Sequence, residues 1–388
     1  MSFTGKVYKR FKELYNDEPV IVRSPGRVNL IGEHTDYNSG FVLPAAVNKA
    51  VYAGISKRED DKILLYAAEF DQHFTTDIHT LAPNKERWPD YILGVADQFQ
   101  KQGLTISGFN MVLDGNVPIG AGMSSSAAVE CATAKALSEL FAPGLSKLDM
   151  VKMAQAAEHE FAGVKCGIMD MFASVFGKKD HVIKLDCRSL EYAYVPFDFD
   201  DIAIVLFDTG IKHSLASTEY NVRRQQCEAG VAMIQKHYTG VHSLRDATME
   251  MLDACVKHDA VVYNRCSFIV AEIQRLQDAC NDLQHNDISA FGKRMFETHA
   301  GLSRLYEVSC PELDVLVESV KNNHAVMGAR MMGGGFGGCT INLVKKDMIH
   351  TLVHETTAKY KGATGRDLQV YIASIENGTE VMHGLINA

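Results

Sequence analysis

The sequence predicts an α+β fold made of two closely packed domains. Its length is the first observation: 388 residues are more than one core normally serves, because domains average about 150 residues. The second observation is the order of the patterns, in which a mixture of strands and helices precedes a long helical region and a final group of strands around one helix. We place the domains at residues 1–199 and 200–388.

The first half is predicted to alternate helices with short strands. Its helices carry apolar residues on one face, and its strands show alternation and β-branched residues. We expect helices at 1–15, from Pro89 to about residue 99, and at about 125–140 and 147–161. We expect strands at 20–23, 50–56, 62–67, 108–113, 182–185 and 202–207.

The second half is predicted to be mainly helical from residue 217 to 323. Long stretches with 3.6-residue periodicity lie at 259–283 and 288–302. The chain then returns to strands at 326–332, 340–344 and 368–375, with a helix at 348–360.

Composition and charge argue against several classes of protein. Apolar residues make up 46% and charged residues 22% of the chain, which is typical of a globular protein. The formal net charge of -9 repels a phosphate backbone, so we expect no nucleic-acid partner. An anionic substrate would need local cations and backbone N–H groups to bind it. No run approaches about 18 apolar residues, so we expect no membrane span.

The cysteines and the N-terminal segment indicate the cytoplasm. The nine cysteines are an odd number without a Cys-x-x-Cys pair, which fits free thiols in a reducing compartment. The first 15 residues spread lysines and an arginine among apolar residues and lack the apolar core of a signal peptide. We expect a cytoplasmic monomer or weak homo-oligomer.

The most informative segment is Pro118-Ile119-Gly120-Ala121-Gly122-Met123-Ser124-Ser125-Ser126-Ala127, which follows a strand and leads into an Ala-rich helix. Glycines let a backbone approach a phosphate closely, and a helix N-terminus supplies free N–H groups and the positive end of the helix dipole. A hydroxyl at the helix start can cap the helix or ligate Mg²⁺. The segment therefore predicts either an anion cradle or a serine-capped helix after a glycine turn.

Two common nucleotide-binding motifs do not fit this segment. A P-loop needs Lys-Ser or Lys-Thr after its glycines, and neither is present. Ser125 stands where a Rossmann fingerprint has its third glycine, and no acidic residue follows at a strand end about 20 residues later. An anion site here would be of another type.

A second glycine-rich segment has the sequence Gly333-Gly334-Gly335-Phe336-Gly337-Gly338. Its letters match a dinucleotide fingerprint, but a strand-like run at 339–343 follows it where that motif requires a helix. Between two strands, the segment predicts a hairpin tip whose backbone comes close to a ligand or to another loop.

A third segment crowds charged and polar residues between two predicted strands. It reads Ser24-Pro25-Gly26-Arg27-Val28-Asn29-Leu30-Ile31-Gly32-Glu33-His34-Thr35-Asp36-Tyr37-Asn38. Carboxylates beside an imidazole can bind a metal or accept hydrogen bonds from sugar hydroxyls. Spacing alone leaves these two options open beside a simple solvated loop.

Together the three segments resemble the galactokinases, which belong to the GHMP kinases. The run from Pro25 to Asn38 is similar to the signature of that family, whereas other GHMP kinases lack Gly-Glu-His-Thr-Asp. Similarity continues at 166–170, 177–181, 186–190 and 219–224, so the resemblance spans residues 20 to 343. It implies an N-terminal domain like the second domain of ribosomal protein S5, and a ferredoxin-like C-terminal domain with a helical insertion.

The resemblance also implies an activity and a set of site residues. The activity is transfer of the γ-phosphate of ATP to the anomeric hydroxyl of D-galactose, with Mg²⁺ as cofactor. Asp170 matches the family's base and Arg27 its stabiliser of the transition state. The ATP phosphates would lie on Gly120, Ala121, Gly122, Met123, Ser124, Ser125 and Ser126. Mg²⁺ would lie on Ser126 and Glu158. The sugar-binding positions would be Glu33, His34, Thr35, Asp36, Gly167 and Tyr220, with Gly333–Gly338 as a third loop motif.

Several alternatives stay open. Asp170 either takes the proton late in a loose transition state or mainly orients the hydroxyl. A catalytically silent galactose sensor, or a kinase for N-acetylgalactosamine, would share the fold, although intact Ser126, Glu158 and Asp170 argue against the sensor. Met171 stands where the family often has Gln, and Met123 replaces a frequent Leu at conserved volume.

The remaining aromatic and imidazole groups are predicted to be structural. The single Trp88 and the other histidines are assigned to packing or to the surface. His159 lies between two glutamates but lacks the second histidine of a His-Glu-x-x-His zinc site.

Overall fold

A six-stranded sheet is the frame of the first half of the molecule. The computed structural model describes residues 1–211 and 216–383, and within them the strand order of this sheet is β13-β1-β3-β6-β4-β5. Its strands are β1 (Val20–Asn29), β3 (Pro44–Lys57), β4 (Lys62–Ala67), β5 (Gln72–Asp77), β6 (Phe109–Gly115) and β13 (Glu380–Val381). The pair of β4 and β6 is parallel, and the other neighbours are antiparallel.

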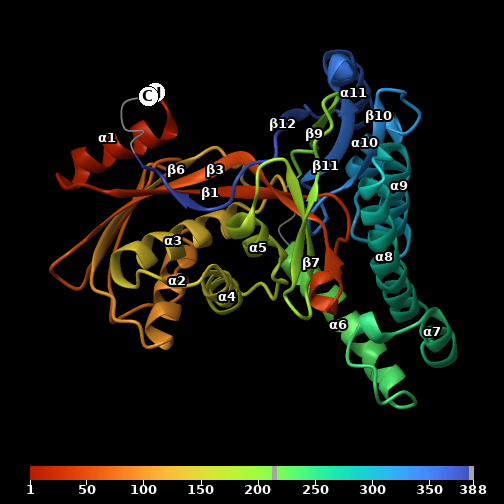
Figure 1. Ribbon diagram of the computed structural model, residues 1–388, viewed down its shortest axis with the longest axis horizontal. Helices are drawn as coiled ribbons and strands as arrows, with labels where there is room; N and C mark the ends of the chain where they lie inside the picture. The colour runs from red at the N-terminus through yellow and green to blue at the C-terminus, as the bar shows by residue number, and fades with distance from the viewer. Residues whose placement is uncertain (212–215, 384–388) are drawn as a thin grey trace.

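Helices cover both faces of this sheet (Figure 1). Side chains alternate between the faces along β6: Val112 packs with α1 (Phe3–Tyr15), whereas Met111 and Leu113 join the main core on the opposite face. That core is closed by α2 (Asp90–Lys101), α3 (Ser125–Phe141), α4 (Lys147–Ala157) and α5 (Met169–Phe176). The site described below lies at the starts of α3 and α5.

A small three-stranded sheet backs α5. It consists of β2 (Phe41–Val42), β7 (His181–Asp186) and β8 (Tyr192–Pro196), in the order β2-β7-β8 among the described residues. Its buried side chains pack with Met171 and Phe172 of α5. This packing fixes the helix whose first turn holds Asp170.

The second half contains a four-stranded antiparallel sheet in the order β10-β11-β9-β12, counted over the described residues. Its strands are β9 (Ile202–Asp208), β10 (Val326–Met331), β11 (Cys339–Lys345) and β12 (Gln369–Ala373). Because β11 lies between β9 and β10 and is antiparallel to both, the sheet has the split β-α-β arrangement of a ferredoxin-like domain. The ferredoxin-like prediction for the C-terminal domain is confirmed.

Helices connect the strands of this second sheet (Figure 1). Between β9 and β10 lie α6 (Ala216–Gln235), α7 (Met249–Cys255), α8 (Ala260–Gln284), α9 (Ile288–Arg304) and α10 (Pro311–Val320). They lie in the region of the predicted helical insertion, and α10 packs with α11 against the sheet as the helix of the split β-α-β unit. The return from β11 to β12 is made by α11 (Ile349–Thr364).

The chain crosses between the two sheets more than once. The second sheet begins with β9 at Ile202, but β13 pairs with β1 through Val22 and Val381. The division at residues 199 and 200 therefore stays a prediction. The C-terminal strand β13 returns to the sheet of the first half.

The predicted loop at 24–38 is partly wrong. β1 continues through Ser24 to Asn29, so Arg27 lies on a strand. Pro25 and Gly26 lower strand propensity in sequence analysis, but a register shift between Pro25 and Arg27 accommodates them inside the sheet. The sequence prediction also began β3 too late, at residue 50 instead of Pro44, and omitted β2, β5, β8 and β13.

Candidate active site

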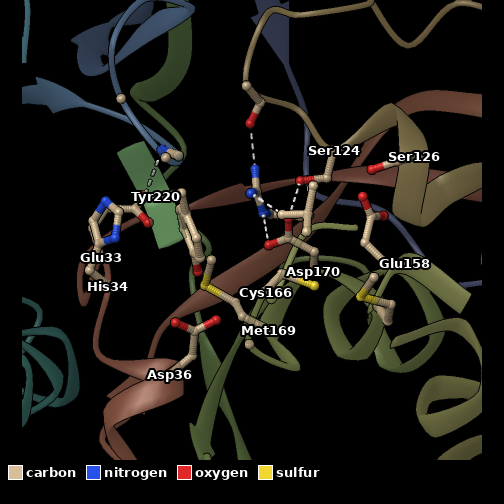
Figure 2. A pocket seen from close by; sticks show the side chains of 18 of the residues that line it. Glu33, His34, Asp36, Ser124, Ser126, Glu158, Cys166, Met169, Asp170 and Tyr220 are labelled. Carbon is tan, nitrogen blue, oxygen red and sulfur yellow. Dashed lines mark hydrogen bonds and ion pairs between the residues drawn. The ribbon is translucent and has the colours of Figure 1, made fainter. Parts of the chain in front are cut away.

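All three segments singled out in the sequence meet at one cavity of about 340 Å³. Predicted site residues that line it are Arg27, Glu33, His34, Asp36, Gly120, Gly122, Ser124, Ser125, Ser126, Glu158, Gly167, Asp170, Tyr220 and Gly333–Gly335. Figure 2 shows Asp170 and Ser124 facing each other between two groups of side chains. Glu33, His34 and Tyr220 lie on one side of them, and Ser126 and Glu158 on the other.

Three of the predicted phosphate- and sugar-binding residues do not line the cavity, and neither do Phe336, Gly337 and Gly338 of the predicted third loop. The Thr35 hydroxyl donates to the Gly32 carbonyl at 3.0 Å and to the Phe41 carbonyl at 2.5 Å, so it shapes the loop from within. The side chains of Ala121 and Met123 belong to the main hydrophobic core. For Thr35, direct contact with a sugar is therefore disfavoured, because its hydroxyl hydrogen is already used.

Arg27 and Asp170 form a bidentate ion pair in the cavity. The Arg27 Nε and Nη2 atoms donate to Oδ1 and Oδ2 of Asp170 at 2.7 and 2.8 Å. Ser124 Oγ donates to Oδ2 at 2.5 Å, and Arg27 Nη1 donates to the Gly122 carbonyl. Burial alone would lower the pKa of Arg27, but the charges of Asp170, Glu33 and Asp36 outweigh it and raise that pKa. The site thus holds a fixed positive charge beside an oriented carboxylate.

The glycine loop turns sharply into α3. Gly120 and Gly122 have positive φ angles of 80° and 76°, and Ser124 adopts the left-handed conformation with φ 55°. Ser124 precedes the helix but caps none of its N–H groups, because its hydroxyl is used by Asp170. The serine-cap alternative is therefore wrong for Ser124, and the uncapped helix N-terminus favours the anion cradle.

The loop at 30–38, which we call the sugar-signature loop, is held by residues from the second half of the chain. Glu33 Oε1 accepts hydrogen bonds from Gly333 N at 2.8 Å and from Arg330 Nη2 at 3.0 Å. Gly167 lies directly against Asp36, where an added Cβ would come within 1.9 Å of Oδ2. Any larger residue at position 167 would displace the Asp36 side chain.

Burial shifts the pKa values of two residues in this loop. The pKa of Asp36 is raised to about 7, first by burial and then by the negative charge of Asp170. The pKa of His34 is lowered to about 4, mainly by burial. His34 is therefore neutral at physiological pH, and Asp36 changes its charge within the physiological range.

Glu158 lies in a π-helical turn, η2 (Glu158–Ala162), a type of irregularity that often marks functional sites. Its carboxyl group is hydrogen-bonded by Ser126, yet Oε2 is buried and receives no donor from the described residues. Glu130 on α3 lies against it, fully buried at 0% exposure, and neither of its oxygens receives a donor there. Burial raises the pKa of Glu158 to about 7 and that of Glu130 well above its ordinary value.

These oxygen donors fit a hard divalent cation. The Glu158 carboxylate and the Ser126 hydroxyl line the cavity and are oxygen ligands of the kind that Mg²⁺ prefers. Mg²⁺ usually takes only one or two carboxylates and completes its shell with phosphate and water. In the described part of the chain, no cluster of three or more His, Cys, Asp or Glu side chains could hold a metal. Sequence analysis missed Glu130, because its position four residues after Ser126 places it on the same helix face but does not show that it is buried.

A second, apolar cavity of about 300 Å³ adjoins the first and shares Ser125 and Ser126 with it. Trp88 and Tyr91 line it, together with apolar residues of β3 and β6. Trp88 packs edge-on against Phe74 as predicted, but it also borders this cavity. No local sequence motif predicts this cavity, because its lining residues are spread over positions 51 to 129.

Comparison with known proteins identifies the class. Residues 90–178 match the GHMP kinases N terminal domain, and residues 279–355 match the GHMP kinases C terminal domain. The fold and the cavity therefore define a GHMP kinase. Residues 9–57 match the galactokinase galactose-binding signature.

Full-length relatives identify the branch of that class. The chain is 39% identical to a galactokinase of Roseiflexus sp., covering 97% of this chain and 96% of that protein. It is 41% identical to a galactokinase of Thermotoga petrophila, over 92% of this chain and 99% of that one. It superposes on the Lactococcus lactis galactokinase complexed with galactose with a TM-score of 0.93, at 32% identity over 97% and 98% of the two chains. The chain belongs to the galactokinase family, and the predicted family and fold class are confirmed.

None of the helices in residues 1–211 and 216–383 is long and apolar enough to cross a membrane.

Proposed function

We propose that this protein transfers the γ-phosphate of ATP to the anomeric hydroxyl of D-galactose, giving galactose 1-phosphate and ADP. One observation carries the proposal: the Arg27–Asp170 pair lies between the sugar-signature loop and the glycine loop Gly120–Ser126 in a single cavity. A sugar hydroxyl bound at the first loop and a phosphate bound at the second would therefore both lie next to this pair. Phosphoryl transfer depends mainly on such positioning and on neutralised charge.

The nucleotide is proposed to span the two adjoining cavities. Phosphates would rest on the loop Gly120–Ser126 and on the free N–H groups at the start of α3. The purine base would occupy the apolar cavity beside Trp88 and Tyr91, since Ser125 and Ser126 border both spaces. The aromatic rings of Trp88 and Tyr91 and the exposed side chain of Ile119, which also lines this cavity, support this placement of the base.

Mg²⁺ is proposed to be held by Ser126 and Glu158. When bound there, the cation would neutralise charge on the phosphates. The chain's own part is to keep the Glu158 carboxylate fixed between Ser126 and Glu130. We assign Glu130 as a supporting residue because it does not line the cavity.

Asp170 is proposed to orient the attacking hydroxyl and to accept its proton late. A carboxylate offers about four acceptor positions, and Arg27 and Ser124 occupy three of them in this site. One position remains for the sugar hydroxyl. The three donors fix the direction of the Asp170 carboxylate, which favours orientation of the hydroxyl with late proton transfer over early abstraction.

Galactose is proposed to bind against Glu33, His34, Asp36, Gly167 and Tyr220. Charged acceptors such as Asp36 bind two neighbouring hydroxyls well, and each such bond contributes about 1.5–3 kcal/mol.

The cytoplasm is the proposed location, because all nine cysteines are free thiols and most are buried.

A panel of sugars tests the proposal. ADP release in the presence of Mg-ATP is measured with galactose, glucose, N-acetylgalactosamine and no sugar. We expect ADP release above background with galactose. Galactose binding without ADP release would indicate a sensor, and faster turnover of N-acetylgalactosamine than of galactose would change the proposed substrate.

A further inference from the structure

A continuous chain of buried polar groups lies behind the sugar-signature loop. His34 Nδ1 is 2.8 Å from the Tyr37 hydroxyl, which is 2.7 Å from the Tyr306 hydroxyl. The Tyr306 hydroxyl is 3.2 Å from Cys227 Sγ. Of these four residues only His34 lines the cavity. We call Tyr37, Tyr306 and Cys227 the relay.

The relay is anchored in the helical insertion. Tyr306 follows α9 and is fully buried, its ring packs against Phe268 at 5.0 Å, and its carbonyl accepts from Arg223 Nε at 2.8 Å. Cys227 comes from α6, the helix that also supplies Tyr220 to the cavity. His34 and Tyr37, which lie in the first half of the chain, are thus held by Tyr306 and Cys227 from the second half.

The surroundings of the imidazole decide which ring nitrogen bears the proton. A neutral histidine has one N–H group, and burial keeps His34 neutral. Its Nε2 atom is buried and makes no hydrogen bond of regular geometry with the described residues. The backbone of Gly334 acts on the ring as a hydrogen-bond acceptor, and because Nδ1 is taken by Tyr37 we assign this contact to Nε2. A bare Nε2 lone pair against a carbonyl oxygen would be repulsive, so the proton belongs on Nε2. Nδ1 must then accept from the Tyr37 hydroxyl.

The rest of the relay is consistent with this direction. With Tyr37 donating to Nδ1, its oxygen is left to accept from the Tyr306 hydroxyl at 2.7 Å, and the Tyr306 oxygen is left to accept from the Cys227 thiol at 3.2 Å. Burial raises the pKa of this thiol to about 11, so it keeps its hydrogen. In the opposite direction the relay would end on sulfur, which is a weak acceptor.

We propose that Tyr37 and Tyr306 are positioning residues that hold His34 in the Nε2–H tautomer and direct this N–H towards the backbone of Gly334. The inference rests on the proposed binding of galactose in this cavity. His34 and Gly334 both line the cavity, so the relay fixes the wall against which the sugar binds, while the carboxylates of Glu33 and Asp36 act as acceptors. His34 has a positive φ angle of 62°, a backbone conformation that few residues other than glycine adopt.

Removing single hydroxyl groups tests the relay. Tyr37→Phe removes the donor to Nδ1 but keeps the ring that packs against Tyr220 at 5.2 Å. We expect galactose affinity, measured by calorimetry without nucleotide, to fall about tenfold, with an unchanged KM for ATP. Tyr306→Phe is expected to have a smaller effect. The double variant is expected to be no worse than Tyr37→Phe, because both hydroxyls act through one histidine. Tyr238→Phe, an exposed tyrosine, is the matched control.

The tautomer gives a readout that does not depend on activity. In ¹⁵N-histidine spectra of the wild type, we expect His34, assigned by its loss in His34→Gln, to show a protonated Nε2. In Tyr37→Phe this signal is expected to shift towards a mixture of tautomers. A protonated Nδ1 in the wild type, or unchanged tautomer and affinity in Tyr37→Phe, would overturn the inference. A wild type that binds no galactose would overturn the proposed function, whereas the spectra would still decide the tautomer.

Discussion

We predict that Asp36 makes galactose binding dependent on pH in a defined direction. Burial raises its pKa in the folded protein to about 7, and the ionised form is the one proposed to accept two hydrogen bonds from sugar hydroxyls. The apparent dissociation constant equals the intrinsic one divided by the fraction of competent protein. That fraction falls from about nine tenths at pH 8 to about one tenth at pH 6, so the Kd for galactose should rise about ninefold. His34, with a pKa of about 4, stays neutral throughout.

The assay is calorimetric titration of galactose at pH 6, 7 and 8 without nucleotide or Mg²⁺, so that Glu158 plays no part. Asp36→Asn is the control, because it keeps the size of the side chain and cannot ionise. We expect this variant to bind more weakly than the wild type at pH 8 and to show a flat pH profile. A wild-type Kd that is the same at pH 6 and pH 8 would refute this account of Asp36.

The same shift predicts how stability changes with pH. An unfolded Asp36 ionises near its ordinary pKa of about 4, whereas the folded residue ionises near about 7. Between these values the folded chain holds the extra proton, so the stability of the ligand-free protein falls as the pH rises through this window. Thermal unfolding of Asp36→Asn should show a smaller fall than that of the wild type.

Three further substitutions address the rest of the site. Asp170→Asn should lower kcat by about 10²–10⁴ and, because it leaves Arg27 without its counter-charge, cost about 3 kcal/mol of stability in urea unfolding; wild-type turnover would remove Asp170 from the mechanism. Glu158→Ala should raise the Mg²⁺ concentration needed for half-maximal rate and leave galactose affinity intact; an equal loss of galactose affinity in calorimetry would give Glu158 another role. Gly167→Ala places a methyl group 1.9 Å from Asp36 Oδ2 and should raise the KM for galactose at least about tenfold without changing that for ATP. An unaltered galactose KM would mean that this wall is not part of the sugar site.

The sequence was sufficient for the parts of the fold that depend on local patterns. The hairpin tip at Gly333–Gly338 followed from five glycines between two alternating runs, and β10 and β11 form that hairpin. The helical insertion followed from long 3.6-residue periodicity. Resemblance to a family placed Arg27 and Asp170 in one site, and they form an ion pair across 143 positions of sequence.

What escaped the sequence depends on distant partners. Strand β1 runs on through Pro25 because β3 pairs with it on both sides of a register shift. Ser124 was predicted to hold phosphate, but nothing in its own segment indicates that Asp170 would take its hydroxyl. Glu130 was overlooked because a glutamate in a helix normally faces solvent, and only the packing of α3 shows that it is buried beside Glu158.

The position of the transferred phosphate tests the central claim most directly. Wild-type protein is incubated with galactose, ATP and Mg²⁺, and the product is identified by ³¹P NMR with coupling to the sugar protons. The account predicts one sugar phosphate whose phosphorus couples to the anomeric proton, formed together with an equal amount of ADP. A phosphate at the 6-position, or ADP formed without any sugar phosphate, would contradict it.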